Sequence, residues 1–301
     1  MLSIGSCFAD FIGGQLVKNK FRMVSNPFGV IFHPLAQFQL LSMALKEQMP
    51  AENSYVLNQG IWYNYLFHSS FSDTSRENLE DRIAKKFEQL NSQIAELDIL
   101  FFTFGTAIQY QHLSSGLIVA NCHKVPQKEF KKSLTPLELI ISSFNSLLSA
   151  NPNFKPQIIL SVSPVRHLSE GIESNSVSKA ALRLVCQQLT QSAGKVHYFP
   201  GFEIMMDDLR DYRFYENDMI HPNETARAYI WDLFIENYLD NGARNFVREW
   251  EKIVRSIKHR PFHPHSDAHQ EFIKKTLMRI EQLPGSIDTT DEVAQLKKNL
   301  I

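Results

Sequence analysis

The sequence predicts an α/β fold built around a central parallel sheet. Nearly unbroken apolar runs at residues 98–104 and 157–163 are typical of strands that are buried on both faces of a sheet. Each run follows a segment with helical spacing of its apolar side chains, at 74–96 and 136–150. Strands that alternate with helices in this way favour parallel pairing, because a parallel connection needs a long crossover.

The other elements of the expected domain can be assigned from the N-terminus onward. Residues 1–4 form a short apolar strand that ends at Gly5, and helical spacing begins at Phe8 and continues to residue 19. Pro200 ends a further short strand at 195–199. Additional helices are expected at 34–48, 175–193 and 223–257.

The tail that begins at Arg260 differs in composition from the rest of the chain. It is polar and contains three prolines, and helical spacing returns at 266–283 and 289–300. We therefore expect one α/β domain at 1–258 and a C-terminal helical extension at 259–301. This extension would pack across the domain or onto a partner.

Composition excludes several classes of protein. The 301 residues have a net charge of -1, so no field of one sign indicates nucleic acid or a membrane surface as a partner. No apolar run approaches the roughly 20 residues of a membrane span. The three cysteines form no metal-binding pair, and no signal peptide is visible at Met1. We expect a cytoplasmic protein without metal or cofactor, provided that no native segment precedes Met1.

Chemically capable residues follow the ends of the expected strands. Gly-Ser-Cys at 5–7 follows the first strand, Gly-Thr-Ala at 105–107 follows the strand at 98–104, and Ser-Pro-Val-Arg-His at 163–167 follows the strand at 157–163. Ligands of open parallel sheets bind beyond these carboxyl ends. The sequence thus predicts a site that gathers these turns.

Ser6 and Cys7 are the candidate nucleophiles. Gly5 permits a tight turn, and the residue after it would lie at a helix N-terminus, where the helix dipole stabilises an alkoxide or thiolate. In the alternative interpretation, Ser6 caps the helix and Cys7 is a small buried apolar residue.

Asp218 and His221 form a candidate acid–base pair. An aspartate three residues before a histidine can accept the Nδ1 proton and leave Nε2 free as a general base. The alternative is a surface loop followed by a helix start at Pro222 and Asn223.

Further residues are candidates for binding roles. Gly29, Gly105 and Thr106 could donate to an oxyanion, or could simply shape turns. Arg166 and His167 suit an anionic or sugar-like substrate, or could ion-pair with a surface carboxylate. The polar stretch at 121–124 adds Asn121 and His123 as substrate-binding candidates. The histidine-rich segment at 259–269 carries no distinctive ligand spacing, so we predict no metal there.

Seven ordered motifs make the chain similar to the GSCFA family. The stretch at 5–9 reads Gly-Ser-Cys-Phe-Ala, the motif from which that family takes its name. The other matching stretches lie at 26–29, 104–107, 121–124, 163–167, 210–215 and 221–223.

The resemblance implies a branch of the SGNH (GDSL-type) hydrolases. It implies a flavodoxin-like three-layer α/β/α sandwich and metal-independent hydrolysis of small-molecule or carbohydrate esters. The last block of that superfamily, Asp-x-x-His, carries over onto Asp218 and His221. In the first block, Gly-Asp-Ser, the frame places Ser6 at the aspartate and Cys7 at the nucleophile. Ser6 stays open as the nucleophile because relatives use a hydroxyl.

One departure from the superfamily pattern leaves three functional classes open. Ala107 stands where the superfamily has an oxyanion-hole asparagine, so backbone groups, Thr106 or Asn121 would have to compensate. The chain could therefore be an esterase or acyltransferase, a weakly active or inactive module that binds a glycan or protein, or an assembly subunit that docks through its tail. Its oligomeric state stays open.

Overall fold

The computed structural model describes residues 1–94, 96–192 and 194–300. The predicted helices at 74–96 and 175–193 each include one residue, 95 and 193, that lies outside this part of the chain.

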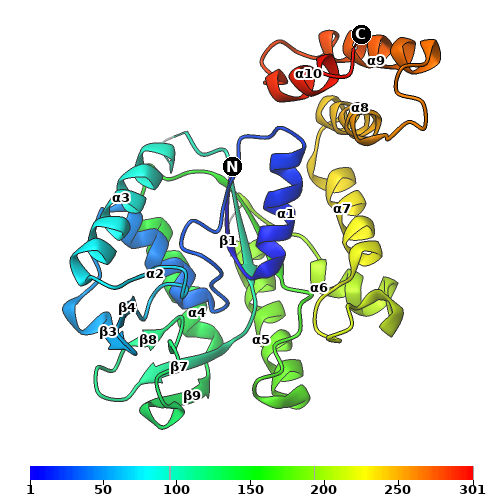
Figure 1. Ribbon diagram of the computed structural model, residues 1–301. Helices are drawn as coiled ribbons and strands as arrows, with labels where there is room; N and C mark the ends of the chain where they lie inside the picture. Colours follow the sequence, from blue (N-terminus) through cyan, green and yellow to red (C-terminus); the bar gives the residue numbers. More distant parts are fainter. Residues whose placement is uncertain (95, 193, 301) are drawn as a thin grey trace. The chain divides into compact units, whose positions relative to one another are not determined.

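A five-stranded parallel sheet forms the centre of the fold (Figure 1). Its strands are β1 (Leu2–Gly5), β2 (Val24–Ser25), β6 (Ile99–Phe104), β10 (Gln157–Val162) and β11 (Val196–Tyr198). Their spatial order is β2-β1-β6-β10-β11, and β10 pairs with β6 in parallel along its whole length. The expected neighbouring central strands are therefore confirmed. In chain order the sequence of strands is 2-1-3-4-5, the flavodoxin-like arrangement.

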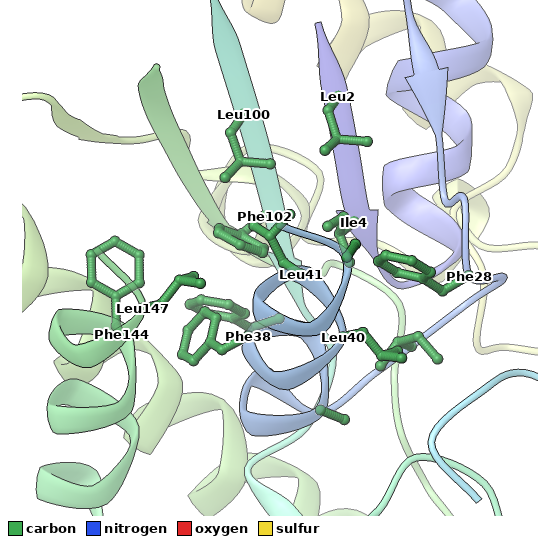
Figure 2. Close-up of a cluster of buried hydrophobic side chains, with 14 of the residues drawn as sticks. Leu2, Ile4, Phe28, Phe38, Leu40, Leu41, Leu100, Phe102, Phe144 and Leu147 are labelled. Carbon is green, nitrogen blue, oxygen red and sulfur yellow. The ribbon is translucent and has the colours of Figure 1, made fainter. Parts of the chain in front are cut away.

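Helices cover both faces of this sheet, as the α/β/α prediction requires. On one face lie α2 (Pro34–Leu45), α3 (Arg76–Ile94), α4 (Leu137–Ser149) and α5 (Gly171–Ser192). Figure 2 shows Phe38 of α2 among the strand side chains, and its ring centroid lies 5.3 Å from that of Phe102. On the opposite face α1 (Cys7–Lys18) places Phe8 at 6.5 Å from Phe101. Adjacent side chains of β6 thus pack into separate cores on the two faces of the sheet. This packing explains why the run is apolar without interruption.

Two small antiparallel sheets were not predicted. One has the order β3-β4-β5 and the other β8-β7-β9. The bounds are Tyr55–Asn58, Ile61–Asn64 and Ser72–Asp73 for the first, and Ile118–Val119, Ile108–His112 and Phe130–Leu134 for the second. Their strands are short and rich in polar residues, so they lack the apolar run that identifies a buried strand. Because β7 begins at Ile108, four residues after β6 ends, the second sheet extends from the carboxyl edge of the central sheet.

The predicted single helix at 223–257 is wrong. This range contains two helices, α7 (Glu224–Tyr238) and α8 (Asn241–Lys258). The side chain of Asp240 accepts a hydrogen bond from the Ala243 N–H at 2.8 Å and starts the second helix. Asp is among the strongest N-capping residues, and the cap explains why a continuous helical pattern is interrupted here.

The C-terminal unit has its own apolar cluster. The chain forms two compact units, one of residues 1–14 and 23–230 and the other of 15–22 and 231–301. In the second unit α8 packs with α9 (Asp267–Glu281) and α10 (Thr290–Lys297) through a buried cluster of Trp250, Ile253, Ile273, Ile280 and Leu296. The first unit ends at Ile230, and α8 contributes to the cluster of the second unit. No helix in the described ranges has the length and apolarity needed to cross a membrane.

Candidate active site

The candidate site lies where the strand order of the sheet reverses, between β1 and β6. In flavodoxin-like sheets ligands bind at this point, outside the carboxyl ends of the strands. The turn after β1 is tight: a Cβ on Gly5 would lie 2.4 Å from the carbonyl oxygen of Thr103. Only glycine fits here, and Ser6 and Cys7 follow it directly.

Ser6 is a buried helix cap. Its Oγ donates to the Oγ of Ser163 at 2.9 Å and accepts from the Phe8 N–H at 3.2 Å. Its exposed fraction is 1%. These contacts agree with the alternative interpretation, in which Ser6 caps the helix. Its hydroxyl already has two hydrogen-bond partners inside the protein.

Cys7 is the first residue of α1 and is only partly buried. Burial raises the pKa of its thiol, and the carboxylate of Asp10 raises it further. Burial and the nearby carboxylate thus oppose the thiolate that a position at a helix N-terminus favours. The backbone N–H of Cys7 is the first of α1.

Asp218 and His221 lie within hydrogen-bond distance, as predicted. Nδ1 of His221 is 2.6 Å from Oδ2 of Asp218. Oδ1 of Asp218 accepts the backbone N–H groups of Ile220 at 2.8 Å and of His221 at 3.0 Å. These hydrogen bonds lower the pKa of Asp218 to about 2. Because a carboxylate only accepts, the proton of the imidazole resides on Nδ1 and Nε2 is left as the basic nitrogen.

The loop that holds this pair has an unusual backbone. Met219 has φ of 59°, in the left-handed region that a residue with a side chain rarely adopts. Its carbonyl oxygen accepts from Nη1 of Arg166 at 3.0 Å. Non-glycine residues in such conformations gather at functional sites, where surrounding contacts hold them in place.

One segment after β10 connects the two halves of the site. Ser163 contacts Ser6, and the Arg166 N–H donates to the Ile220 carbonyl at 3.2 Å. Three residues span at most about 11 Å, so the turn that carries Cys7 and the loop that carries His221 approach the same short stretch of chain. Within the described residues no hydrogen bond joins His221 to Ser6 or Cys7.

Lys179 anchors this stretch and was missed by the sequence analysis. Its ammonium is buried and donates to the carbonyl oxygens of Gly105 at 2.9 Å, Ser163 at 2.7 Å and Val165 at 3.0 Å. Burial lowers the pKa of Lys179 to about 7, whereas three carbonyl acceptors favour its charged form. A signal was present: Lys179 occupies a core position of α5, three residues before the buried Leu182.

The three candidate oxyanion donors are already paired. The N–H groups of Gly105 and Thr106 both donate to the Phe32 carbonyl, at 2.8 Å and 3.3 Å, and that of Gly29 donates to Asn26 at 2.8 Å. The hydroxyl of Thr106 accepts from the Ile108 N–H at 3.0 Å. The three N–H groups therefore have acceptors inside the protein, since buried backbone groups find partners wherever they can.

Asn121 and His123 form part of a packed aromatic cluster. His123 is 3% exposed, with Nε2 at 2.8 Å from the Asn64 carbonyl and Nδ1 at 3.2 Å from Oγ of Ser69. Burial lowers its pKa to about 4. The side chain of Asn121 accepts from the His123 N–H at 2.9 Å. Both side chains therefore stabilise their own loop, and none of these contacts involves Cys7 or His221.

Arg166 and His167 lie beside the loop of the acid–base pair. The guanidinium of Arg166 stacks over the ring of Tyr215 at 4.1 Å. His167 contacts Phe32 edge to face at 5.7 Å, and burial followed by the charge of Lys179 lowers its pKa. Arg166 contacts the loop of residues 218–221 directly, through its hydrogen bond to the Met219 carbonyl.

Two further residues hold the turns and were not singled out. Asn26, with φ of 40°, accepts from the Gly5 N–H at 2.7 Å and donates to Asp10 at 2.8 Å. Ser178 accepts from the Ala107 N–H at 2.7 Å. A hydroxyl from α5 thus satisfies the backbone beside Ala107.

The histidine-rich segment makes aromatic contacts. The rings of His259 and His269 lie 6.5 Å apart, and that of Phe272 lies 6.0 Å from His269. In the described ranges no group of three or more His, Cys, Asp or Glu is arranged to hold a metal ion.

Comparison with known protein families shows to which family the chain belongs. The sequence model of the GSCFA family matches residues 1–234, and the model described as GSCFA domain protein, C-terminal domain, matches 250–301. The chain belongs to the GSCFA family. No curated protein and no solved structure gives a significant match to this GSCFA chain. The relation to SGNH hydrolases stays a prediction.

Proposed function

We propose that this GSCFA protein hydrolyses carboxylic esters, with Cys7 as nucleophile, His221 as general base and Asp218 as the residue that orients it. The supporting observation is the 2.6 Å contact between His221 Nδ1 and Asp218 Oδ2, in a loop tied to the carboxyl edge of the sheet. This contact holds the imidazole in the tautomer that a general base needs.

The reaction follows from the groups present. Nε2 of His221 takes the thiol proton of Cys7, the sulfur attacks the ester carbonyl, and the alcohol leaves with the proton from Nε2. A thioester of Cys7 results. Water then attacks this thioester, His221 accepts the proton of the water, and the carboxylic acid and the free thiol are released.

A thiol of raised pKa is consistent with this role for His221. A preformed thiolate would need no base, whereas the raised pKa of Cys7 makes deprotonation by Nε2 necessary during attack. The N–H of Cys7 opens α1 and supplies one oxyanion donor at the positive end of the helix dipole. The assignment favours Cys7 over Ser6, because the Ser6 hydroxyl is buried and donates to Ser163.

A non-catalytic binding module is the second candidate. The observation that favours it is the lack of a hydrogen bond between His221 and either candidate nucleophile in the described residues, together with the paired state of Gly29, Gly105 and Thr106. Such a module would bind an ester or glycan without turnover.

Hydrolysis of p-nitrophenyl butyrate by matched variants separates the candidates. Cys7→Ala and His221→Ala should each lower kcat/KM by at least about a hundredfold. Cys122→Ala is the control, because Cys122 is also a half-buried thiol with a raised pKa. Loss of activity in Ser6→Ala but not in Cys7→Ala would transfer the role to Ser6. Absence of turnover by the wild-type protein across short-chain esters would favour the binding module.

A further inference from the structure

We propose that a small pocket beside the Asp218–His221 loop binds a short aliphatic group that ends in a carboxylate, with Arg166 as the residue that recognises this carboxylate. This inference rests on the proposed function, and it names the substrate class: esters whose acyl part is short and bears a second, free carboxylate. We call this cavity the Arg166 pocket. It is lined by Arg166, by Met205, Met206 and Leu209, and by residues of the 210–215 segment.

Residues that line the Arg166 pocket contact the loop of the acid–base pair. Tyr215, which lines the pocket, forms an isolated antiparallel bridge with Pro222. The Glu216 N–H donates to the His221 carbonyl at 2.8 Å. Arg166 itself donates to the Met219 carbonyl at 3.0 Å. A group held in the pocket thus lies beside the short loop that carries the His221 imidazole.

Arg166 is the cation of the pocket that is free to receive an anion. The other arginine of the lining, Arg210, is paired with Asp207 at 2.8 Å, and the carboxylate Asp211 lies 3.7 Å from Arg213. In the part of the chain that the structure describes, Arg166 has no carboxylate partner. Only its Nη1 is engaged, by the Met219 carbonyl, so other N–H groups of the guanidinium are available.

Two tyrosines fix the plane of this guanidinium. Its central carbon lies 4.1 Å from the ring centroid of Tyr215 and 5.4 Å from that of Tyr212. Stacking of this kind holds the fork of N–H donors in one orientation, and a fixed fork matches the two oxygens of a carboxylate. A phosphate dianion would carry more charge than this one unpaired cation neutralises.

Apolar residues of a segment with an uncommon backbone also line the pocket. Residues Ile204–Asp208 form a π-helical turn, closed by the Leu209 N–H donating to the Ile204 carbonyl at 3.0 Å. Single π turns are rare and often occur at functional sites. This turn places Met205 and Met206 in the lining, and methionine side chains adapt to aliphatic ligands of varied shape.

The size of the cavity limits the ligand. Its volume is about 180 Å³. A chain of a few carbons with one carboxylate fits this space. The apolar wall and the single cation together select a short carboxylate.

Binding of butyrate tests this inference without any turnover. Protein labelled with ¹³C at its methionine methyl groups is titrated with butyrate and, separately, with the neutral butyramide. We expect butyrate to shift the Met205 and Met206 methyl signals, and butyramide to bind at least about tenfold more weakly because it lacks the charge.

Arg166→Met should lower the affinity for butyrate about tenfold or more, and Arg166→Lys should give an intermediate value. Arg210→Met is the matched control and should bind butyrate within about twofold of wild type, since Arg210 is already paired. Equal binding of butyrate and butyramide, equal losses in Arg166→Met and Arg210→Met, or no shift at Met205 and Met206 would overturn the inference. The titration measures binding alone, so it can be interpreted even if the esterase assay shows no activity. The proposed function and this inference can therefore be refuted independently.

Discussion

Nζ of Lys179 donates to the carbonyl oxygen of Ser163 at 2.7 Å, while the side chain of Ser163 accepts from Ser6 at 2.9 Å. A single buried ammonium therefore holds the strand end that contacts the turn before Cys7. Because Lys179 also binds the Gly105 carbonyl, it ties together the carboxyl ends of β6 and β10. The geometry of the candidate site depends on a residue that touches no substrate.

Replacing Lys179 should destabilise the fold. Lys179→Met leaves three buried carbonyl groups without their donor, and we expect a loss of about 2–4 kcal/mol in the free energy of unfolding at pH 7. Urea denaturation followed by circular dichroism measures this change. Unchanged stability in Lys179→Met would show that the three hydrogen bonds contribute nothing net.

Lys179 should also make stability depend on pH. Its pKa falls from 10.5 to about 7 on folding, so between these values the unfolded chain binds a proton that the folded chain has released. Stability of the wild-type protein should therefore rise with pH from about 7 towards 10.5, relative to Lys179→Met. Denaturation at pH 6.5, 8 and 9.5 measures this difference, and parallel profiles would contradict it.

Gly29 should prove to be a structural residue. Its φ is 76°, and a Cβ there would lie 2.3 Å from Cβ of His68. We expect Gly29→Ala to lower the unfolding free energy by about 1–3 kcal/mol, with kcat of the remaining folded protein largely retained. Thermal unfolding and a kinetic assay on the same sample separate the two effects. A stable Gly29→Ala protein with a strongly reduced kcat would restore Gly29 as an oxyanion donor.

Asp218→Asn should preserve the fold and impair catalysis. An amide in place of the carboxylate favours the imidazole tautomer with the proton on Nε2, which cannot act as a base. We expect kcat/KM to fall by about 10²–10⁴-fold, the scale of such a change in serine proteases. The pKa of Asp218 is about 2 in the wild-type protein, so the pair should stay intact down to about pH 3. Wild-type kcat/KM in a folded Asp218→Asn protein would contradict this assignment.

The three cysteines should differ in their rates of alkylation. Cys7 is partly exposed with a raised pKa, Cys122 has a pKa of about 11, and Cys186 is fully buried. Iodoacetamide at pH 8 should therefore label Cys7 first, Cys122 more slowly and Cys186 last. The rate at Cys7 should keep rising above pH 9, because burial and Asp10 oppose its ionisation. Rapid labelling of Cys7 in mildly acidic buffer would contradict this prediction and would favour a Cys7 thiolate.

The central fold could be predicted from the sequence because its signals are strong and local. The runs that became β6 and β10 are apolar on both sides of the strand, since side chains such as Phe101 and Phe102 face separate cores. The small sheets were not predicted, because strands such as Phe130–Leu134 contain lysines and pair with short neighbours. Asp240 inside a helical pattern was a capping signal that a search for periodicity alone overlooked.

The candidate site was predicted in part. The spacing of Asp218 and His221 was sufficient to predict their contact, because a turn of three residues brings the two side chains together. The oxyanion candidates were not predictable in the same way, since the partner of the Gly105 N–H is Phe32, more than seventy residues earlier in the chain. Lys179 binds carbonyl groups in the segments that follow β6 and β10, and such long-range contacts leave no local pattern.

The most direct test of the proposed mechanism is to identify the residue that carries the acyl group. The wild-type protein is mixed with p-nitrophenyl butyrate, quenched in acid within the first turnover, digested, and examined by peptide mass spectrometry. The mechanism predicts a butyryl thioester on Cys7, absent in Cys7→Ala and strongly reduced in His221→Ala, while Cys122 and Cys186 stay unmodified. A butyryl ester on Ser6, or butyrylation of Cys7 at an unchanged rate in His221→Ala, would contradict it.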